Sequence, residues 1–248
     1  MSLSAAPTLR RVTDPQDPAI GRVGALQDQI YFEPDMLIPA GYIAHMLGAP
    51  AVGSARQDGL LVAEDAAGTV LAASLFHYLP AADTGFGSFS GVAPAARGQG
   101  LLRRLHAARW ALLDELAGHP VPALFIDVVS PGRETPAQRE QESRAGSDAL
   151  ERRQKFQALG FRTVDLVYWQ PVGGEDGGPV KDMDLLAGLR SGTQTIAVAQ
   201  VAATMQAYWT PWLGAARAAQ AAAELAARAG GQPEVRLLPA WDSPDAQP

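Results

Sequence analysis

The sequence predicts a mixed α+β fold, in which helices flank a twisted, mostly antiparallel sheet and a helical extension follows on its C-terminal side. Two β-rich runs enclose a glycine-containing turn at residues 65–68, a pattern typical of a hairpin. After a further β-like run, the hydrophobic period changes to that of an amphipathic helix and then to a short apolar strand. This order predicts an antiparallel meander followed by one β-α-β crossover.

The N-terminal half carries the predicted meander. We expect, in chain order, a strand at 9–13, helices at 19–30 and after Pro39, strands at 60–64 and 70–79, and a strand at 84–92. The last of these contains Gly85, Gly87 and Gly91, which weaken an ordinary strand. These glycines predict a bulge, or a close approach to the backbone by another group.

The segment 100–116 has the clearest helical pattern, with leucines along one side and charged residues along the other. It is expected to end at Pro120, before an apolar strand at 123–129. The remaining elements of this part are a polar loop at 130–146, a helix at 147–159 that stops at Gly160, and strands at 161–170 and 181–189.

We therefore divide the chain into three parts. Residues 1–190 are expected to form one α+β domain, and residues 191–229 an Ala-rich helical extension that packs on it and breaks near Pro211. Residues 230–248 are rich in Pro, Asp and Gln and are predicted to be a flexible tail.

Composition excludes several classes of function. The 248 residues carry a formal net charge of −6, which argues against nucleic acid as a partner. The chain has no cysteine, and its four histidines show no metal-ligand spacing, so we expect no metal. No signal peptide or membrane span is expected, which predicts a cytoplasmic protein that binds no membrane. We expect a monomer or a homodimer.

The loop at 91–102 carries the chemistry, because it joins a strand to the start of the strong helix. Free N–H groups and the helix dipole at such a start form a cradle for phosphate. Gly98 and Gly100 let an anion approach the main chain, and Arg97, Arg103 and Arg104 add positive charge. The alternative is an ordinary turn with solvated arginines.

The segment 92–101, Val-Ala-Pro-Ala-Ala-Arg-Gly-Gln-Gly-Leu, resembles the acyl-CoA-binding signature of the GNAT N-acetyltransferase superfamily. That signature has the core Arg/Gln-x-x-Gly-x-Gly/Ala after the fourth strand. Arg97 and Gly100 match it, whereas Leu102 stands where a small residue is usual.

A second match lies at 155–161, where Lys-Phe-Gln-Ala-Leu-Gly-Phe is similar to the family's segment of helix, Leu-Gly-Phe and next strand. The resemblance covers about residues 9–189. It implies a GNAT-like enzyme that moves an acetyl or other short acyl group from acyl-CoA to an amine by direct attack, without a covalent enzyme intermediate.

The resemblance also implies how the cosubstrate, acetyl-CoA, is bound. The amides of 98–102 would hold the pyrophosphate, and the main chain at Gly91 and Val92 would pair with the pantetheine arm. A bulge near these residues would splay the fourth and fifth strands and open a slot for the thioester. We expect the following residues to bind it: Gly91, Val92, Arg97, Gly98, Gln99, Gly100, Leu101, Leu102, Arg103, Arg153 and Phe156.

Amine attack needs a base, because an amine with a pKa of about 10.4 is almost entirely protonated at pH 7. The candidates are Glu33, His77, Asp127 and Glu134. Asp127 is the most unusual of them, since a carboxylate within an apolar strand must be paired or must face a cleft.

The acid that protonates the leaving thiolate is a tyrosine in many family members, but Phe156 stands at the matching position. Tyr168, Tyr78 or water are the alternatives. We assign catalysis to Val92, whose N–H would stabilise the oxyanion, to Asp127 as base and to Tyr168 as acid.

Three functions stay open. They are the amine acyltransferase, an acyl-CoA-binding domain with little or no turnover that acts as a sensor or interaction module, and an interaction scaffold without CoA. The second is motivated by Phe156 and Leu102. A small molecule or a peptide could supply the acceptor amine, and the sequence does not distinguish them.

Overall fold

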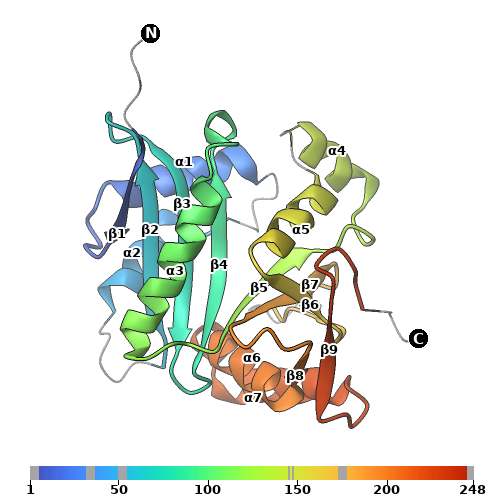
Figure 1. Ribbon diagram of the computed structural model, residues 1–248. Coiled ribbons are helices and arrows are strands. Elements are labelled where there is room, and N and C mark those ends of the chain that lie inside the picture. The colour runs from blue at the N-terminus through green and yellow to red at the C-terminus, as the bar shows by residue number, and fades with distance from the viewer. Residues whose placement is uncertain are drawn as a thin grey trace.

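The computed structural model describes residues 6–31, 37–49, 55–144, 146, 148–172 and 178–244. Within these residues the predicted mixed α+β fold is confirmed, with helices on both faces of a sheet of nine strands (Figure 1). The strand order is β1-β2-β3-β4-β5-β7-β6-β9-β8, and all neighbours except β4 and β5 run antiparallel.

The elements lie close to the predicted ones over the first half of the chain. They are β1 (Thr8–Val12), α1 (Ala19–Ile30), α2 (Ala40–Gly48), β2 (Gln57–Glu64), β3 (Val70–Leu79), β4 (Thr84–Val92), the short 3₁₀ helix η2 (Pro94–Ala96), α3 (Leu101–Ala117) and β5 (Ala123–Val129). The second half contributes α4 (Pro136–Arg144), α5 (Ala149–Ala158), β6 (Phe161–Val164), β7 (Met183–Leu189), β8 (Thr195–Ala197), α6 (Val198–Leu213), α7 (Ala215–Ala227) and β9 (Glu234–Leu238).

The meander and the crossover are both present. The hairpin turn between β2 and β3 is closed by the Asp65 carboxylate, which accepts the N–H groups of Ala67 and Thr69 at 2.9 and 2.8 Å. Helix α3 then connects β4 to β5, which pair in parallel with Gly85–Gly87 opposite Leu124–Ile126. This crossover places the start of α3 beside the C-terminal end of β4.

The helices cover the two faces of the sheet unequally. Helix α3 lies in front of β2, β3 and β4 in Figure 1, while α1 and α2 lie behind them. A Cβ on Gly85 would lie 2.6 Å from the side chain of Leu113, so glycine at this position lets α3 pack closely. Helix α6 packs beside β3 and β4 on the face opposite α3, where Tyr208 stacks on Phe86 with ring centroids 3.7 Å apart.

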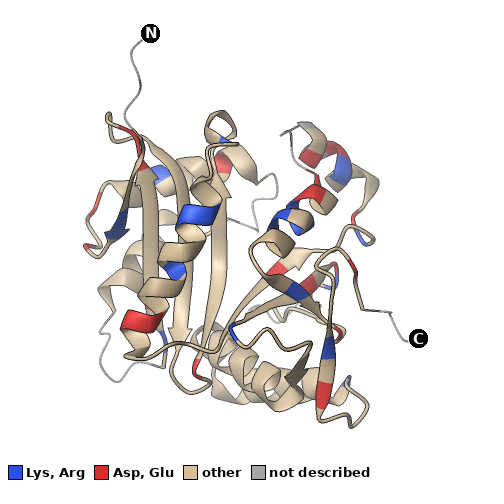
Figure 2. Cartoon of the chain, in the orientation of Figure 1, with Lys and Arg blue, Asp and Glu red and all other residues tan. Residues whose placement is uncertain are grey.

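The helical extension is present, but it breaks three residues later than predicted. Pro211 lies inside α6, near its end, where the missing N–H removes only one hydrogen bond. Gly214 separates α6 from α7, and its φ of +79° is a conformation that side chains disfavour. Both helices carry few charges (Figure 2), and Trp209 is buried between them and the sheet.

Two predicted boundaries in the second half are wrong. The polar loop expected at 130–146 contains α4, whose Thr135 hydroxyl caps the N–H of Gln138 at 3.2 Å. The strand expected at 161–170 ends at Val164, because the Leu166 N–H turns back onto the Val164 carbonyl at 2.7 Å. Gln170 then makes an isolated bridge with Val180.

The predicted flexible tail at 230–248 is also wrong over most of its described part. Strand β9 pairs with β6 and with β8, and Leu237 and Ala240 are buried. Alternating apolar residues at Val235 and Leu237 were outweighed in the sequence by the Pro and Asp residues that surround them. Residues 245–248 lie outside the described part of the chain.

Arg153 binds the segment that follows β9 to the rest of the domain. Its side chain is fully buried and donates to the Asp184 carboxylate at 3.0 Å, to the Thr163 hydroxyl at 2.8 Å and to the carbonyls of Ala240 and Asp242. All of its nitrogens are used in these contacts. The expectation that Arg153 binds CoA is therefore wrong, because folding of the C-terminal segment encloses it.

We expect Arg153→Ala to lower the free energy of unfolding by about 3 kcal/mol, because it removes the only fully buried cation that pairs with Asp184 among the described residues and leaves that carboxylate with the partly exposed Arg133 and the Ser243 hydroxyl. Urea unfolding measures this change. Arg152→Ala is the control, because Arg152 is partly exposed and pairs with Glu142 near the surface, where such a pair contributes about 1 kcal/mol or less. Equal losses in the two variants would contradict the role of Arg153.

Candidate active site

The loop before α3 presents a run of free backbone N–H groups. Gly98 and Gly100 have φ of +79° and +72°, which turn the chain sharply into the helix. The first helical N–H with a partner is that of Arg104, which donates to the Gly100 carbonyl at 3.1 Å. Within the described part of the chain, the N–H groups of residues 98–103 meet no acceptor. Six amides without an acceptor at a helix start have the geometry and the dipole that favour an anion.

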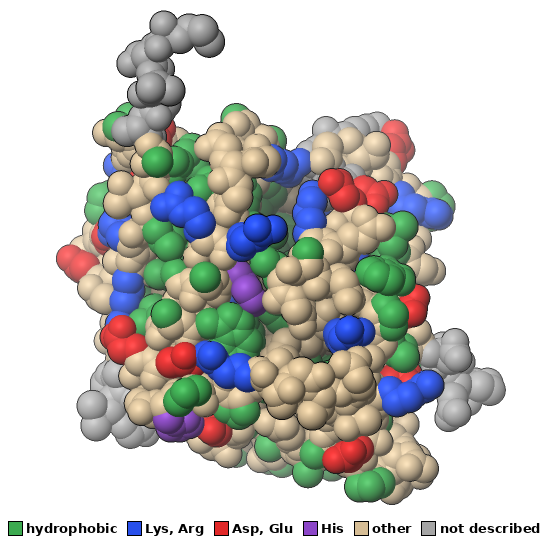
Figure 3. Space-filling view, viewed as in Figure 1, with side chains coloured by type: hydrophobic (Ala, Val, Ile, Leu, Met, Phe, Trp, Pro, Cys, Tyr) green, Lys and Arg blue, Asp and Glu red, His purple; other side chains and the backbone are tan. Residues whose placement is uncertain are grey.

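A groove of about 550 Å³ opens beside this loop, between α3 and α5. Arg97, Arg103, Arg152 and Lys155 line it, so that positive charge stands on both sides. Figure 2 shows blue residues on α3 and α5, and Figure 3 shows blue side chains gathered around the upper centre of this face. Asp148 also lines the groove, but in a chain with a net charge of −6 the four basic side chains make it a local surface of positive charge.

The β4 residues that line the groove, Ser90 to Val92, lie beyond the point where β4 and β5 separate. Their pairing ends at Gly87 and Ile126. The register between β3 and β4 also shifts here, because Leu75 pairs with Phe89 and Phe76 with Gly87, which leaves Ser88 as the extra residue of a bulge. A bulge that splays the two strands was expected near Gly91 and Val92, and it lies three to four residues earlier.

The backbone of Val92 faces the opening between the strands. The N–H of Ala93, the next residue, donates to the Leu71 carbonyl of β3 at 2.8 Å. Since successive N–H groups of a strand point to opposite edges, the N–H of Val92 points away from β3 and toward the side from which β5 has diverged. This orientation suits the predicted contact with a bound group.

A smaller pocket of about 130 Å³ continues from the groove into the split. Ser88 and Ser90 line it from β4, Asp127 from β5, Tyr31 from the residue after α1, and Phe156 from α5. The two hollows share five lining residues, so they form one continuous path from the loop amides to Asp127; these are Ile30, Tyr31, Ser90, Arg152 and Phe156.

Asp127 is the carboxylate at the inner end of this path. Burial raises its pKa to about 6, and a hydrogen bond from the Tyr168 hydroxyl at 3.0 Å opposes this shift only in part. The group is therefore ionised at neutral pH and has a pKa suited to accepting a proton.

Tyr168 lies behind Asp127 and does not line the path. Its side chain is fully buried and stacks on Trp209, with ring centroids 6.2 Å apart. Burial raises its pKa well above the usual 10, and its proton points to Asp127. The structure thus places Tyr168 as a support for Asp127, and the prediction that it acts directly as the acid is wrong.

Most of the other predicted binding residues meet at the groove. Those that line it are Gly91, Val92, Arg97, Gly98, Gly100, Leu101, Leu102, Arg103 and Phe156. Gln99 contributes its N–H to the free run, while its side chain is exposed outside the groove. Arg153 points into the protein, as described above.

The other candidate bases, and Tyr78 as an alternative acid, lie in different parts of the fold. Glu134 lines the inner pocket, where burial raises its pKa and its Oε1 has no partner among the described residues. His77 and Tyr78 lie under the meander and line neither hollow. Glu33 is outside the described residues.

Several residues of the path were missed in the sequence. Arg152 stands four residues before Phe156, so helical spacing alone places the two on one side of α5. Lys155, Tyr31 and Ser90 carried no comparable signal, because their roles depend on how distant elements meet. Ser88 could be found only from the bulge.

The described residues lack the features of two other classes of site. No three His, Asp or Glu side chains gather there in a way that could hold a metal ion. Among the same residues, no helix combines the length and the apolar character needed to cross a membrane.

No model of a known protein family and no curated protein matches the sequence. Solved structures are similar to it. A protein from Desulfovibrio desulfuricans described as a GNAT-family acetyltransferase is 19% identical, with a TM-score of 0.48 over 73% of this chain and 98% of its own. Ard1 from Thermoplasma volcanium is 14% identical to this chain, with a TM-score of 0.47 over 75% of this chain and 98% of its own. A GCN5-related N-acetyltransferase from Kribbella flavida is 21% identical, with a TM-score of 0.43 over 74% of this chain and 98% of its own. At such low identity, the function of this chain must be inferred from its own loop, groove and side chains.

Proposed function

We propose that this protein is an N-acyltransferase that moves an acetyl or other short acyl group from acyl-CoA to an amine. The observation that carries the proposal is the continuous path from the six free amides at 98–103, through the split between β4 and β5, to Asp127. One end fits a pyrophosphate and the other carries a base.

The groove fits the parts of CoA in order. The loop amides and Arg97 would receive the diphosphate, because amides at a helix start and guanidinium groups both favour phosphate. The outward N–H of Val92 would pair with the amide-containing pantetheine arm. Phe156 offers an apolar wall where the arm meets the inner pocket.

The inner pocket supplies the acid–base chemistry. Asp127 accepts a proton from the acceptor ammonium or its attached water, which frees the nitrogen lone pair for attack on the thioester carbonyl. A strand N–H at the split would stabilise the oxyanion that forms. The leaving thiolate takes its proton from water, since Phe156 cannot donate one and a thiol of pKa about 8.5 is a fair leaving group.

Thiol release from acetyl-CoA in the presence of a panel of amines tests the proposal, with thermal stabilisation by CoA measured in parallel. Release that depends on an amine supports the acyltransferase. Stabilisation by CoA without release for any amine would replace it with a binding domain, and a Tm unchanged by saturating CoA would remove CoA as a ligand.

We expect Arg97→Ala to weaken CoA binding about tenfold, because a hydrogen bond to a charged group contributes about 1.5 kcal/mol or more. Arg97 also donates to the Gly146 carbonyl at 2.6 Å, which holds its side chain at the groove. Calorimetric titration measures the affinity. Arg11→Ala, which removes an equal charge from β1, is the control and should bind CoA as the parent does. Equal affinities for all three proteins would contradict the role of Arg97.

A further inference from the structure

Three side chains on the neighbouring strands β2, β3 and β4 form a hydrogen-bonded triad on one face of the sheet. Asp58 on β2 and His77 on β3 are direct cross-strand partners, and the Asp58 carboxylate lies 2.5 Å from Nδ1 of His77. On the other side, Nε2 of His77 lies 2.6 Å from the hydroxyl of Ser88 on β4. An acid, an imidazole and a hydroxyl therefore stand in sequence, each within hydrogen-bond distance of the next.

The surroundings of Asp58 and His77 bear on how the triad works. Asp58 is ion-paired with Arg56, whose Nε lies 2.8 Å away. His77 is 1% exposed, and burial holds its pKa below the usual value. In the neutral tautomer that donates its Nδ1 proton to Asp58, the Nε2 lone pair is free to accept the proton of Ser88.

The bulge in β4 brings Ser88, the outermost member of the triad, to the inner pocket. Asp58 and His77 are buried, whereas Ser88 is partly exposed and lines the pocket. Ser88 is the first residue of β4 beyond its last pair with β5, and Asp127 holds the same place on β5. The two side chains thus stand on opposite walls at the start of the split.

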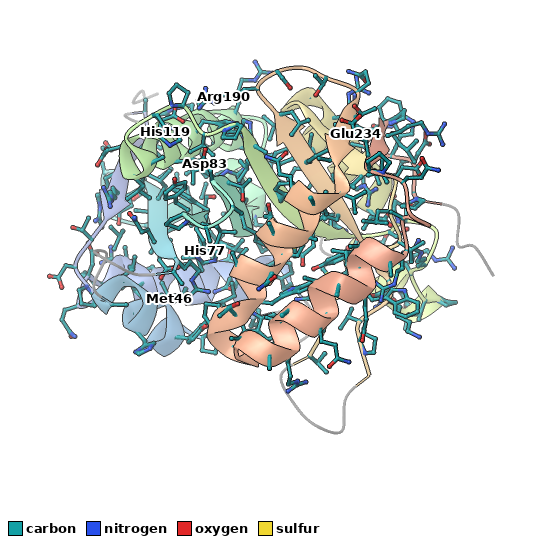
Figure 4. The ribbon with its side chains drawn as sticks, turned by 90° about the horizontal axis from the view of Figure 1, so that it is seen from below. Met46, His77, Asp83, His119, Arg190 and Glu234 are labelled. Atoms are coloured by element: carbon teal, nitrogen blue, oxygen red, sulfur yellow. The ribbon has the colours of Figure 1, made fainter. Side chains whose placement is uncertain are left out.

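Helix α6 completes the surroundings of Ser88. The Tyr208 hydroxyl lies 3.1 Å from the Ser88 oxygen and its ring 5.8 Å from that of His77. Figure 4 shows His77 between α2, which carries Met46, and the two C-terminal helices. Ser88 therefore contacts His77 on one side and the Tyr208 hydroxyl on the other, and an imidazole within hydrogen-bond distance is the base that a nucleophilic hydroxyl needs.

We propose that Ser88, with His77 as its base and Asp58 as the residue that orients His77, cleaves acyl-CoA thioesters by way of an acyl-serine and passes the acyl group to water. This activity rests on the proposed binding of acyl-CoA in the same path. It makes the site a thioester hydrolase in addition to an amine acyltransferase, with the two routes using opposite walls of the pocket.

The bonds and protons of this route balance. The Ser88 oxygen attacks the thioester carbonyl while Nε2 of His77 takes its proton, and the C–S bond breaks. His77 returns that proton to the leaving thiolate, which leaves an ester on Ser88 and free CoA thiol. Water then attacks the ester as His77 accepts its proton, and the proton passes to the serine oxygen as the carboxylic acid departs.

The test uses the full chain with acetyl-CoA and no amine. The parent protein is expected to release thiol and to gain the mass of one acetyl group, located on the peptide that contains Ser88. Ser88→Ala is expected to lower amine-independent release by about 100-fold or more and to show no acetyl group on that peptide. His77→Gln should give the same loss, and Ser191→Ala, at an exposed serine in the turn after β7, should behave as the parent.

Calorimetric titration of each variant with CoA separates this proposal from the binding of the cosubstrate. If CoA binds and amines are acetylated, but neither an acetyl-Ser88 peptide nor amine-independent release is found, the hydrolase is overturned and the acyltransferase stands. If the parent does not bind CoA at all, both proposals fail. A Ser88→Ala protein that binds CoA and hydrolyses acetyl-CoA at the parent rate would also overturn the role of Ser88.

Discussion

Replacing Gly100 by valine is expected to weaken CoA binding at least about 100-fold. Gly100 has a φ of +72°, a conformation that is most unfavourable for a β-branched residue. Relief of that strain rotates the peptide units that aim the amides of 98–103 at the groove. Loss of two charge-assisted hydrogen bonds at about 1.5 kcal/mol each accounts for a 100-fold change, which calorimetric titration measures directly.

The chain offers a matched control at the other end of the same helix. Gly118 follows α3 with a φ of +75°, and a Cβ at either glycine would meet no atom within 4 Å. Gly118→Val therefore carries a similar backbone cost but lies outside the groove, so it should lower Tm and leave the affinity for CoA unchanged. If Gly100→Val binds CoA as well as Gly118→Val does, the loop amides do not hold the phosphate.

The second large effect is expected for Asp127→Asn, which should lower the rate of amine acetylation by about 10² to 10⁴ while CoA still binds. An asparagine can accept the hydrogen bond from Tyr168 but cannot take a proton from an amine. Steady-state rates at saturating acetyl-CoA measure the loss. Acetylation at the parent rate would rule out Asp127 and favour Glu134, the other carboxylate of the inner pocket.

Loss of activity in Asp127→Asn should not reflect loss of the fold. Burial raises the pKa of Asp127 from 3.8 to about 6, so between these values the folded protein binds more protons than the unfolded chain. The contribution of this group to stability therefore falls as the pH rises through that window and is unfavourable at pH 7. We expect the variant to be more stable than the parent at pH 7, as urea unfolding can show.

The same pKa sets the pH dependence of the reaction. The acetylation rate is expected to rise with pH through about 6 as Asp127 ionises. The Tyr168 hydroxyl lowers the pKa of Asp127, so Tyr168→Phe should move this rise to higher pH. A profile that does not move in that variant would mean that another group titrates.

Local sequence was sufficient for much of the fold. The leucine spacing of α3 and the turn at Asp65–Gly68 specify their structures through neighbouring residues, so their predicted bounds lie within a residue or two of the observed ones. Strand β9 and the end of β6 were misread because a strand gains its stability from a partner elsewhere in the chain. Helix α4 was misread because it is polar on all sides, which removes the hydrophobic pattern.

The candidate site also has a part that local sequence predicted and a part that only the folded structure shows. The loop at 98–103 was visible in the sequence because glycine spacing and a helix start are local features. Arg152 and Arg153 are adjacent in the chain, but only the packed C-terminal segment shows that Arg153 is enclosed and Arg152 faces the groove.

The sequence by itself predicted that this chain forms a meander and a crossover, with a glycine-containing loop of backbone amides at the start of α3. Tertiary structure alone decided where β4 leaves β5, how deeply Asp127 is buried behind that split, and that Ser88 meets His77 across the sheet. The physical reason is the distance along the sequence over which the interactions act. Backbone conformation at a glycine is set by adjacent residues, whereas the pKa of a carboxylate and the partner of a hydroxyl are set by groups that only folding brings together.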